Sequence, residues 1–297
     1  MLKFYYQPET ARRLVRPKLQ PTMVLLKAFV LLAGAIAVVS AKSDLWTSTK
    51  DFSNFNVIKN LWNNINVTND PAGGLLNFDK AIKVEFPRGT YASKNSPTTG
   101  KPGGLAFYAK PGPNIFNRDS VALNYKVYFP KNFEWAKGGK LPGLYSKFGQ
   151  SGGHTDDPTG FSYRVMWRAG GQAEAYVYAP SRQDPSIERI PGYFADGTIG
   201  QSIGRGVQTF LADQWNTVKV FIKLNSIQNG RPIADGILKL IINGKPAVDF
   251  SKMIWRSRAD VQIEGVMFQT FFGGNDVSYA PTKDTFIAFK SFSLTEQ

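Results

Sequence analysis

The 297-residue sequence predicts an all-β protein built as an antiparallel sandwich. Short runs rich in β-branched and aromatic residues recur from residue 81 onward, and turn residues separate them. The 28 glycines and 18 prolines are spaced as turn punctuation and are not gathered in a low-complexity tract. No stretch shows the periodicity of a long amphipathic helix. A β-jelly roll is one fold that satisfies these three observations.

The hydrophobic share of the sequence is large enough for a sizeable core. Apolar residues make up 42% and aromatic residues 13% of the chain, and a chain of this length can bury one large core or two small ones. All-β sandwiches of this size are commonly single domains. Because no break in composition divides the chain after residue 42 and no internal repeat is visible, we expect one domain at residues 42–297.

Residues 1–41 predict segments that do not belong to the fold. Met23 to Ala41 combines one lysine, an apolar run at residues 28–39 and a small-residue cleavage site, which together are typical of a secretory signal peptide. Cleavage after Ala41 would make the mature protein secreted and extracellular. A membrane anchor is the competing interpretation, but twelve apolar residues are short for the ~20 that span a bilayer.

Residues 1–22, in front of this segment, include a basic cluster at positions 12, 13, 16 and 18. Our interpretation is that translation begins at Met23 and that residues 1–22 are not translated. A basic cytosolic tail on a signal anchor is the alternative.

Nine runs of the remaining sequence are typical of strands. They lie at residues 81–86, 104–108, 121–129, 161–168, 173–178, 217–224, 236–242, 265–271 and 286–294. The segment at residues 215–224 alternates as expected of a strand with one buried face. Asn243-Gly244 is a hairpin turn signal. The polar stretch from Asp44 to Asn69, with its scattered aromatics, predicts an entry strand and a short helical turn at the edge of the sandwich.

Two of these runs form a predicted hairpin around residues 169–171. A two-residue loop would put Arg164 and Tyr176 on opposite faces of the sheet. A three-residue loop closed by a left-handed glycine pairs these two residues, and it also pairs Ser162 with Tyr178. That register gathers the apolar side chains of both strands on one face, so we predict it. The other face then carries a serine, two arginines and two tyrosines, for which a solvated sheet face is the alternative.

Short motifs around this hairpin resemble one enzyme family. GGKLPGLY stands at residues 138–145, a Ser-x-Arg pair at 162–164 and Tyr-x-Tyr-Ala-Pro at 176–180. With these motifs the chain resembles polysaccharide lyase family 14, the alginate and glucuronan lyases. Further matching segments are FPRGTY at 86–91, PGGLAFYAKP at 102–111, YKVYFP at 125–130 and TFFGGN at 270–275. The resemblance implies a β-jelly roll with a concave substrate cleft.

The resemblance also implies an active site lined by five side chains: Lys140, Ser162, Arg164, Tyr176 and Tyr178. A uronate lyase must neutralise the sugar carboxylate, remove the weakly acidic proton on carbon five and protonate the leaving oxygen. Arg164 suits a bidentate carboxylate contact. Lys140 can neutralise the developing dianion or favour a neighbouring phenolate. We expect Tyr178 to act as acid and base with Tyr176 assisting, and Ser162 to orient the substrate.

Other polar side chains are candidates for contacts with outer parts of a polymeric substrate. They are Lys147, Arg168, Gln269, Arg88 and Lys101. The alternative for each is a solvated surface position, which is the commoner fate of lysine and arginine.

His154 is the only histidine and lies in the segment SGGHTDDPTG. Histidine is the usual base near neutral pH, but this segment is typical of a loop and lies outside the family motif, so we expect a loop residue. Asp156 and Asp157 offer ligands for calcium, but solvation is the favoured interpretation. The sequence predicts no metal and no cofactor.

The charge of the chain indicates a polyanionic partner. Residues 1–41 hold six of the 36 basic residues and one of the 22 acidic residues, so the rest keeps 30 basic against 21 acidic residues, a net charge of +9. Nucleic acid, anionic membrane and acidic polysaccharide are the candidates. No nucleic-acid fingerprint is visible, and secretion places the protein where uronate polymers occur. We therefore expect a monomer that binds an acidic polysaccharide and has no nucleic-acid partner and no stable membrane association after signal cleavage.

Two rival functions are a non-catalytic carbohydrate-binding sandwich and a glycoside hydrolase. Hydrolysis needs two carboxylates across the bond, which laminarinase-like jelly rolls supply in a Glu-x-Asp-x-x-Glu strand motif. No such motif exists, and the only acid of the predicted hairpin is Glu174, opposite Met166. The sequence therefore predicts a secreted lyase that cleaves a uronate polysaccharide, such as alginate or glucuronan, by β-elimination.

Overall fold

The computed structural model of the chain describes residues 44–62, 66–73, 79–92, 100, 103–112, 118–146, 160–195 and 200–296. Contacts within the chain divide it into two units, residues 1–40 and 41–297, and all described residues lie in the second. The signal peptide, its cleavage site and the start of translation lie outside the described residues and stay predictions. In the part of the chain that the structure describes, no helix has the length and apolar character needed to cross a membrane.

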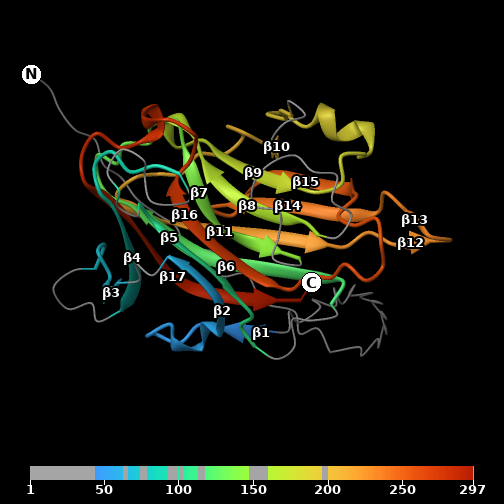
Figure 1. Cartoon of the computed structure of the whole chain (residues 1–297), viewed down its shortest axis with the longest axis horizontal. Coiled ribbons are helices and arrows are strands. Elements are labelled where there is room, and N and C mark those ends of the chain that lie inside the picture. Colours follow the sequence, from blue (N-terminus) through green and yellow to red (C-terminus); the bar gives the residue numbers. More distant parts are fainter. Residues whose placement is uncertain are drawn as a thin grey trace, which may run out of the picture. The chain divides into compact units, whose positions relative to one another are not determined.

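The described residues form two large sheets and one small hairpin (Figure 1). The eight-stranded sheet has β1 (Asp44–Thr47) paired to β17 and otherwise the order β15 (Lys245–Met253), β14 (Gly236–Ile242), β11 (Gln214–Lys223), β6 (Ser120–Phe129), β17 (Thr285–Thr295), β4 (Lys80–Phe86) and β3 (Asn66–Asn69). The seven-stranded sheet has the order β10 (Gln201–Ile203), β9 (Ala173–Tyr178), β8 (Ser162–Trp167), β7 (Gly139–Tyr145), β16 (Gly265–Phe272), β5 (Leu105–Ala109) and β2 (Val57–Trp62). The small hairpin joins β12 (Ile227–Gln228) to β13 (Arg231–Pro232).

The all-β prediction is confirmed. All named strand pairs are antiparallel. The helices of the described residues are short 3-10 turns: η1 (Ser53–Phe55), η2 (Ala169–Gly171), η3 (Pro185–Arg189) and η4 (Val277–Tyr279). Each of the nine predicted runs overlaps an observed strand. The predicted turn joins β14 to β15, with φ of 51° at Asn243 and 76° at Gly244.

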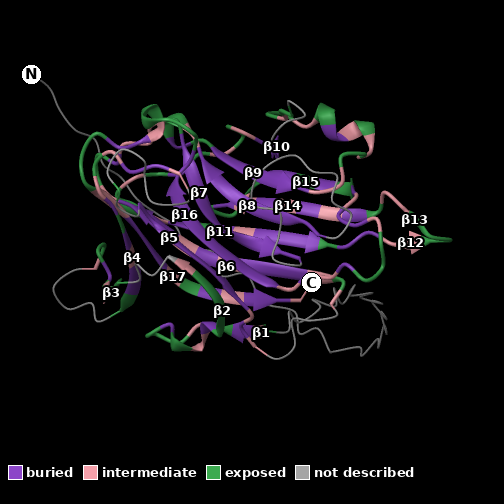
Figure 2. Ribbon diagram, in the orientation of Figure 1, coloured by how far each residue is buried: buried purple, intermediate pink, exposed green. Residues whose placement is uncertain are grey.

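The core lies between the two sheets and is rich in aromatic rings. Trp167 of β8 is fully buried and makes edge contacts with Phe86 of β4 and Phe272 of β16, at centroid distances of 6.4 and 5.3 Å. Figure 2 shows most strands buried along their length, whereas exposed residues gather in turns such as the tip of the β12–β13 hairpin. Because side chains alternate along a strand, the neighbours of Trp167 in β8 project from the other face of the seven-stranded sheet.

The β8–β9 hairpin has the predicted register. Arg164 lies opposite Tyr176, and Ser162 lies opposite Tyr178. The loop is the 3-10 turn η2, and its residues 170–171 are glycines with φ of 66° and 80°. Positive φ is strained for residues with a Cβ atom, so these glycines set the length of the loop and with it the register.

Strand β7 is absent from the predicted runs, because Pro142 and Gly143 disfavour a regular strand. The structure accommodates them in a bulge, where the register against β8 shifts between Leu141 and Gly143. The Pro142 carbonyl accepts a hydrogen bond of 3.1 Å from the hydroxyl of Tyr125 in β6. As a result of the extra residue, Lys140 and Gly143 share one face although they are three positions apart.

Candidate active site

The five side chains expected at the active site, together with the outer-contact candidate Gln269, gather on the face of the seven-stranded sheet that points away from the core. Four adjacent strands supply them: β9, β8, β7 and β16. The residues are Tyr176 and Tyr178 of β9, Ser162 and Arg164 of β8, Lys140 of β7 and Gln269 of β16. All six are buried, with exposed fractions of 0 to 8%. The structure thus brings these residues together, and their individual roles stay predictions.

Lys140 is a buried amine among groups that disfavour its charge. Its Nζ lies 3.7 Å from the centroid of the Tyr176 ring and 3.3 Å from Sδ of Met166. Burial lowers the pKa of Lys140 well below its ordinary value of 10.5, and the positive charges of Arg164 and Arg168 lower it further, while a nearby carboxylate opposes them. The amine of Lys140 can therefore be neutral under conditions in which an exposed lysine is charged.

Arg164 is fully buried against the two tyrosines. Its guanidinium carbon lies 5.9 Å from the ring centroid of Tyr176 and 5.3 Å from that of Tyr178. An Nη atom donates to Oε1 of Gln269 at 2.8 Å, and the guanidinium also hydrogen-bonds the Tyr178 side chain. A guanidinium only donates, so both partners accept from it. The amide of Gln269 and the hydroxyl proton of Tyr178 are left to donate elsewhere.

The two tyrosines form a linked pair. Their hydroxyl oxygens lie 3.3 Å apart, and their rings meet edge to face with centroids 5.4 Å apart. Burial raises the pKa of Tyr176 above its ordinary value of 10, and the charge and hydrogen bond of Tyr178 raise it further. Tyr176 therefore keeps its proton at neutral pH and is a poor base.

Arg168, expected at an outer contact, belongs to a cluster that sequence patterns do not reveal. Its Nε and Nη2 donate to one oxygen of Glu174 at 2.9 and 2.6 Å. The other oxygen of Glu174 accepts from Nε of Arg205 at 2.6 Å, and Ser202 donates to the carboxylate at 3.2 Å. Arg205 lies 31 residues after Glu174, so no local motif joins them.

Among the remaining candidates, Arg88 is described and is not brought to this site. Arg88 lies in the turn after β4 of the eight-stranded sheet, where its backbone N–H donates to Asp284 at 2.7 Å. Five candidates lie outside the described residues: Lys101, Lys147, His154, Asp156 and Asp157. Among the residues that are described, no group of three or more histidine, aspartate or glutamate side chains is arranged to hold a metal.

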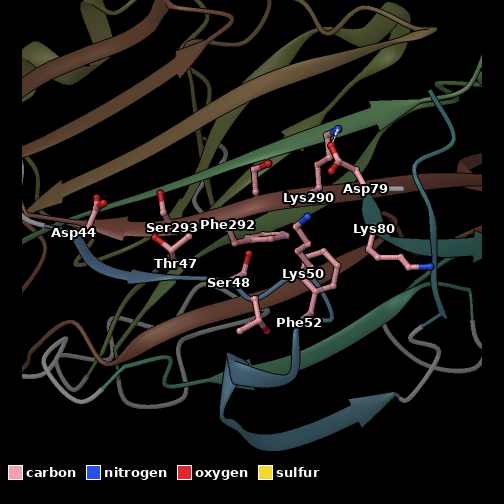
Figure 3. A pocket seen from close by; sticks show the side chains of 12 residues that line it. Asp44, Thr47, Ser48, Lys50, Phe52, Asp79, Lys80, Lys290, Phe292 and Ser293 are labelled. Carbon is pink, nitrogen blue, oxygen red and sulfur yellow. Dashed lines mark ion pairs between the residues drawn. The ribbon is translucent and has the colours of Figure 1, made fainter. Parts of the chain in front are cut away.

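A separate pocket of about 420 Å³ lies beside β1 and β17 of the eight-stranded sheet (Figure 3). Its described lining is largely polar and includes Asp44, Lys50 and Lys290, and Nζ of Lys290 lies 3.9 Å from Asp79. None of the expected catalytic side chains is among these lining residues. The six clustered side chains and this pocket are therefore separate features of the described structure.

Comparisons with known proteins bear on the family and the fold. The sequence profile of the family Polysaccharide lyase 14 matches residues 76–292, a segment that holds all six clustered residues. Among characterised proteins, exolysin of Paramecium bursaria Chlorella virus 1 is 27% identical over 203 residues. That match covers 60% of this chain, and the chain spans only 30% of the length of exolysin.

Two solved structures are similar over most of the chain. The PL-14 alginate lyase from Aplysia kurodai has a TM-score of 0.69 and 25% identity, covering 85% of this chain and 98% of that one. The alginate lyase vAL-1 from Chlorella virus has a TM-score of 0.68 and 26% identity, covering 86% of this chain and 100% of that one. These likenesses confirm the predicted jelly roll.

Proposed function

The chain belongs to polysaccharide lyase family 14, and on that premise we propose that it cleaves an acidic, uronate-containing polysaccharide by β-elimination. Alginate and glucuronan are the candidate substrates. The observation that carries the proposal is the contact of the buried Lys140 amine with the tyrosine pair on one face of the sheet. An amine able to accept a proton and a hydroxyl able to donate one are the two groups that an elimination requires.

We assign the removal of the proton on carbon five to Lys140. Burial and the flanking arginines keep part of its amine neutral, which is the form that acts as a base. Tyr176 does not compete, because its raised pKa keeps it protonated. This assignment replaces the expectation that Tyr178 is both base and acid and that Lys140 supplies positive charge. Tyr178 keeps the second proton transfer.

Tyr178 is the proton donor to the leaving oxygen. Because Arg164 donates a hydrogen bond to the hydroxyl oxygen of Tyr178, the hydroxyl proton of Tyr178 points away from the guanidinium. Tyr176, whose hydroxyl lies 3.3 Å away, holds that hydroxyl in place. A phenol oriented from two sides delivers its proton along a defined direction, which is the assistance expected of Tyr176.

The substrate carboxylate is bound by the amide of Gln269. Since Oε1 of Gln269 accepts from Arg164, its Nε2 amide group is turned toward other acceptors. Arg164 is fully buried, so its charge acts on the carboxylate through Gln269 and through the electrostatic field. Such a preoriented charge stabilises the dianion that develops when carbon five loses its proton. Ser162, opposite Tyr178 in the register, is also fully buried and helps to orient the sugar through that tyrosine.

The elimination balances with these groups alone. The C5–H bond breaks and its proton passes to the amine of Lys140, while the electron pair forms the double bond between carbons four and five. The bond between carbon four and the glycosidic oxygen breaks, and that oxygen takes the proton of Tyr178. The products are a new reducing end and an unsaturated uronate. Proton exchange with solvent restores Lys140 and Tyr178.

We place the reaction outside the cell, with the protein acting as a monomer. The support is the signal-peptide pattern of residues 23–41. A net charge of +9 in the rest of the chain favours encounter with a polyanionic polymer.

Ultraviolet absorbance of the unsaturated product tests the proposal. The purified protein is incubated with alginate, its mannuronate-rich and guluronate-rich fractions, and glucuronan. A lyase produces new absorbance with at least one polymer, and Lys140→Ala prepared in parallel controls for contaminating activity. A hydrolase would release reducing ends without absorbance, and a binding protein would retain the polymer uncleaved. Either result with all of these polymers overturns the proposed function.

A further inference from the structure

Beside the catalytic cluster, one buried carboxylate holds two arginines. Glu174 of β9 is fully buried. Its oxygens accept from Arg168 at 2.6 Å and from Arg205 at 2.6 Å, and Nη2 of Arg205 also donates to Ser202 at 2.8 Å. Two cations against one anion leave a net positive charge on this face.

Stability alone gives little reason for this arrangement. Removing a carboxylate from water costs several kcal/mol, and apolar side chains of similar volume often stabilise a protein as well as a buried ion pair does. What Glu174 supplies is geometry, because it fixes two guanidinium groups that would otherwise sample many rotamers. A preoriented guanidinium binds a carboxylate or sulfate group better than a mobile one.

The arginines continue the catalytic face toward the edge of the sheet. Glu174 and Tyr176 are two positions apart on β9, so they share a face and lie about 7 Å apart along the strand. The guanidinium carbon of Arg168 lies 5.9 Å from the Tyr176 ring centroid. Arg205 follows the edge strand β10, in which Ser202 pairs with Tyr176. A polymer bound at the tyrosines would pass these arginines with its next units.

Arg205 is accessible and has donors to spare. Its side chain is 34% exposed, whereas that of Arg168 is 16% exposed. Within the described part of the chain, the hydrogen bonds of Arg205 come from Nε and Nη2, so its Nη1 group remains available. The ring of Phe194, 49% exposed, lies 5.7 Å from the guanidinium carbon. An exposed ring beside a guanidinium offers an apolar surface to a sugar ring and a cation to its carboxylate.

We propose that Arg205 and Arg168, held by Glu174, bind the carboxylate of a second uronate unit, with Phe194 against its ring. This outer subsite selects substrates long enough to reach it. The inference rests on the proposed function, because it assigns the arginine cluster to the same polymer that the Lys140 site cleaves.

Kinetics on uronate oligosaccharides of graded length and on the polymer test the subsite. Loss of a charge-assisted contact in Arg205→Gln should raise KM for the polymer about tenfold, with kcat affected less. The ratio of variant to wild-type KM should grow with substrate length. Arg205→Lys keeps the positive charge but loses the two-pronged guanidinium geometry. Its KM should lie between those of the wild type and Arg205→Gln. Phe194→Ala should show the same length dependence.

Arg258→Gln is the matched control, since Arg258 is an exposed arginine paired with Asp260 in the loop between β15 and β16. Its KM should follow the wild type at every length. A KM ratio for Arg205→Gln that does not depend on length, with melting temperatures equal to wild type, overturns the subsite. Affinity electrophoresis in polymer-containing gels distinguishes failure of the subsite from failure of the proposed lyase function. If wild type binds but does not cleave, and Arg205→Gln binds more weakly, the proposed function fails and the subsite stands.

Discussion

At Lys140 an amine is buried where its charge is disfavoured. The unfolded chain holds the proton of this lysine up to the ordinary pKa of 10.5, whereas the folded protein releases it at lower pH. Unfolding therefore takes up a proton between these two pKa values, and stability rises with pH in that window. Below the folded-state pKa the full cost of charge burial is present.

Lys140→Met should raise the melting temperature while abolishing cleavage. Methionine keeps an unbranched side chain of similar length without the charge. Each kcal/mol gained corresponds to roughly 2–4 °C for a domain of this size. Calorimetry across a pH series checks the cause, because the gain should be largest below the folded-state pKa and shrink as pH approaches 10.5. A gain that does not vary with pH would show that the charge of Lys140 is not the source.

Tyr178→Phe should lower turnover by roughly 100- to 10,000-fold, the usual contribution of a general acid. The ring and its packing remain, so KM should change much less. Tyr176→Phe should lose less activity, because Tyr176 orients its neighbour and transfers no proton to the substrate. Initial rates of unsaturated product formation give all these values.

His154→Ala distinguishes this mechanism from one with a histidine base. His154 is the only histidine of the chain, and we expect its removal to matter far less than that of Tyr178. An inactive His154→Ala variant beside near wild-type Tyr178→Phe and Tyr176→Phe variants would exclude the lysine–tyrosine mechanism.

At the residue scale, motif and alternation together predict the cluster. Ser162, Arg164 and the two tyrosines follow from strand alternation once the hairpin register is chosen. The contacts around these residues cannot be predicted from strand alternation. The pairing of Glu174 with Arg205 spans 31 residues and an edge strand, and the burial of Lys140 depends on packing from several elements. Long-range contacts of this kind leave no periodic trace in a single sequence.

Among the elements, the η2 loop controls the register of the site. A Cβ atom on Gly171 would lie 2.7 Å from the carbonyl oxygen of Phe210 and 3.0 Å from the Trp135 ring, whereas one on Gly170 would meet nothing within 4 Å. Both glycines have positive φ. Gly170→Ala should therefore cost about 1 kcal/mol of unfolding free energy from backbone strain alone, and Gly171→Ala at least twice as much.

Denaturant unfolding of the two variants checks this difference. Gly170→Ala is the control, since it shares the backbone strain of Gly171→Ala but not the clash. Activity of Gly171→Ala should fall as well, because a displaced loop shifts Arg164 relative to Tyr176. Equal unfolding free energies for the two variants would show that the loop yields without disturbing the strands.

Strands with regular alternation are the elements that the sequence predicts, and irregular ones are those it misses. β11 and β14 carry a clear alternation of apolar and polar residues. β7 carries a proline and two glycines, and the carbonyl of Pro142 in its bulge accepts a hydrogen bond from Tyr125 of the other sheet. This hydrogen bond comes from a residue that is distant in the sequence. Local propensity therefore predicts no strand at β7, although the folded protein forms one.

For the whole molecule, residues 42–297 should be the mature protein. The prediction rests on the signal-peptide pattern of residues 23–41. Expression in a secreting host followed by intact-mass analysis checks it, and the N-terminus should lie at Lys42. Retention of residues 1–41 on the product would instead favour the membrane-anchor interpretation. The all-β architecture is predictable at this scale because turn residues and strand lengths recur along the chain.

The unfavourable burial of Lys140 also has an evolutionary consequence. The residues assigned to holding the polymer, Gln269 and Arg205, are separate from the residue assigned to the base. A lineage in which Lys140 mutates to methionine would gain stability, retain those polymer contacts and lose only cleavage. A single substitution would thus convert a polysaccharide lyase into a carbohydrate-binding protein and would increase its folding stability.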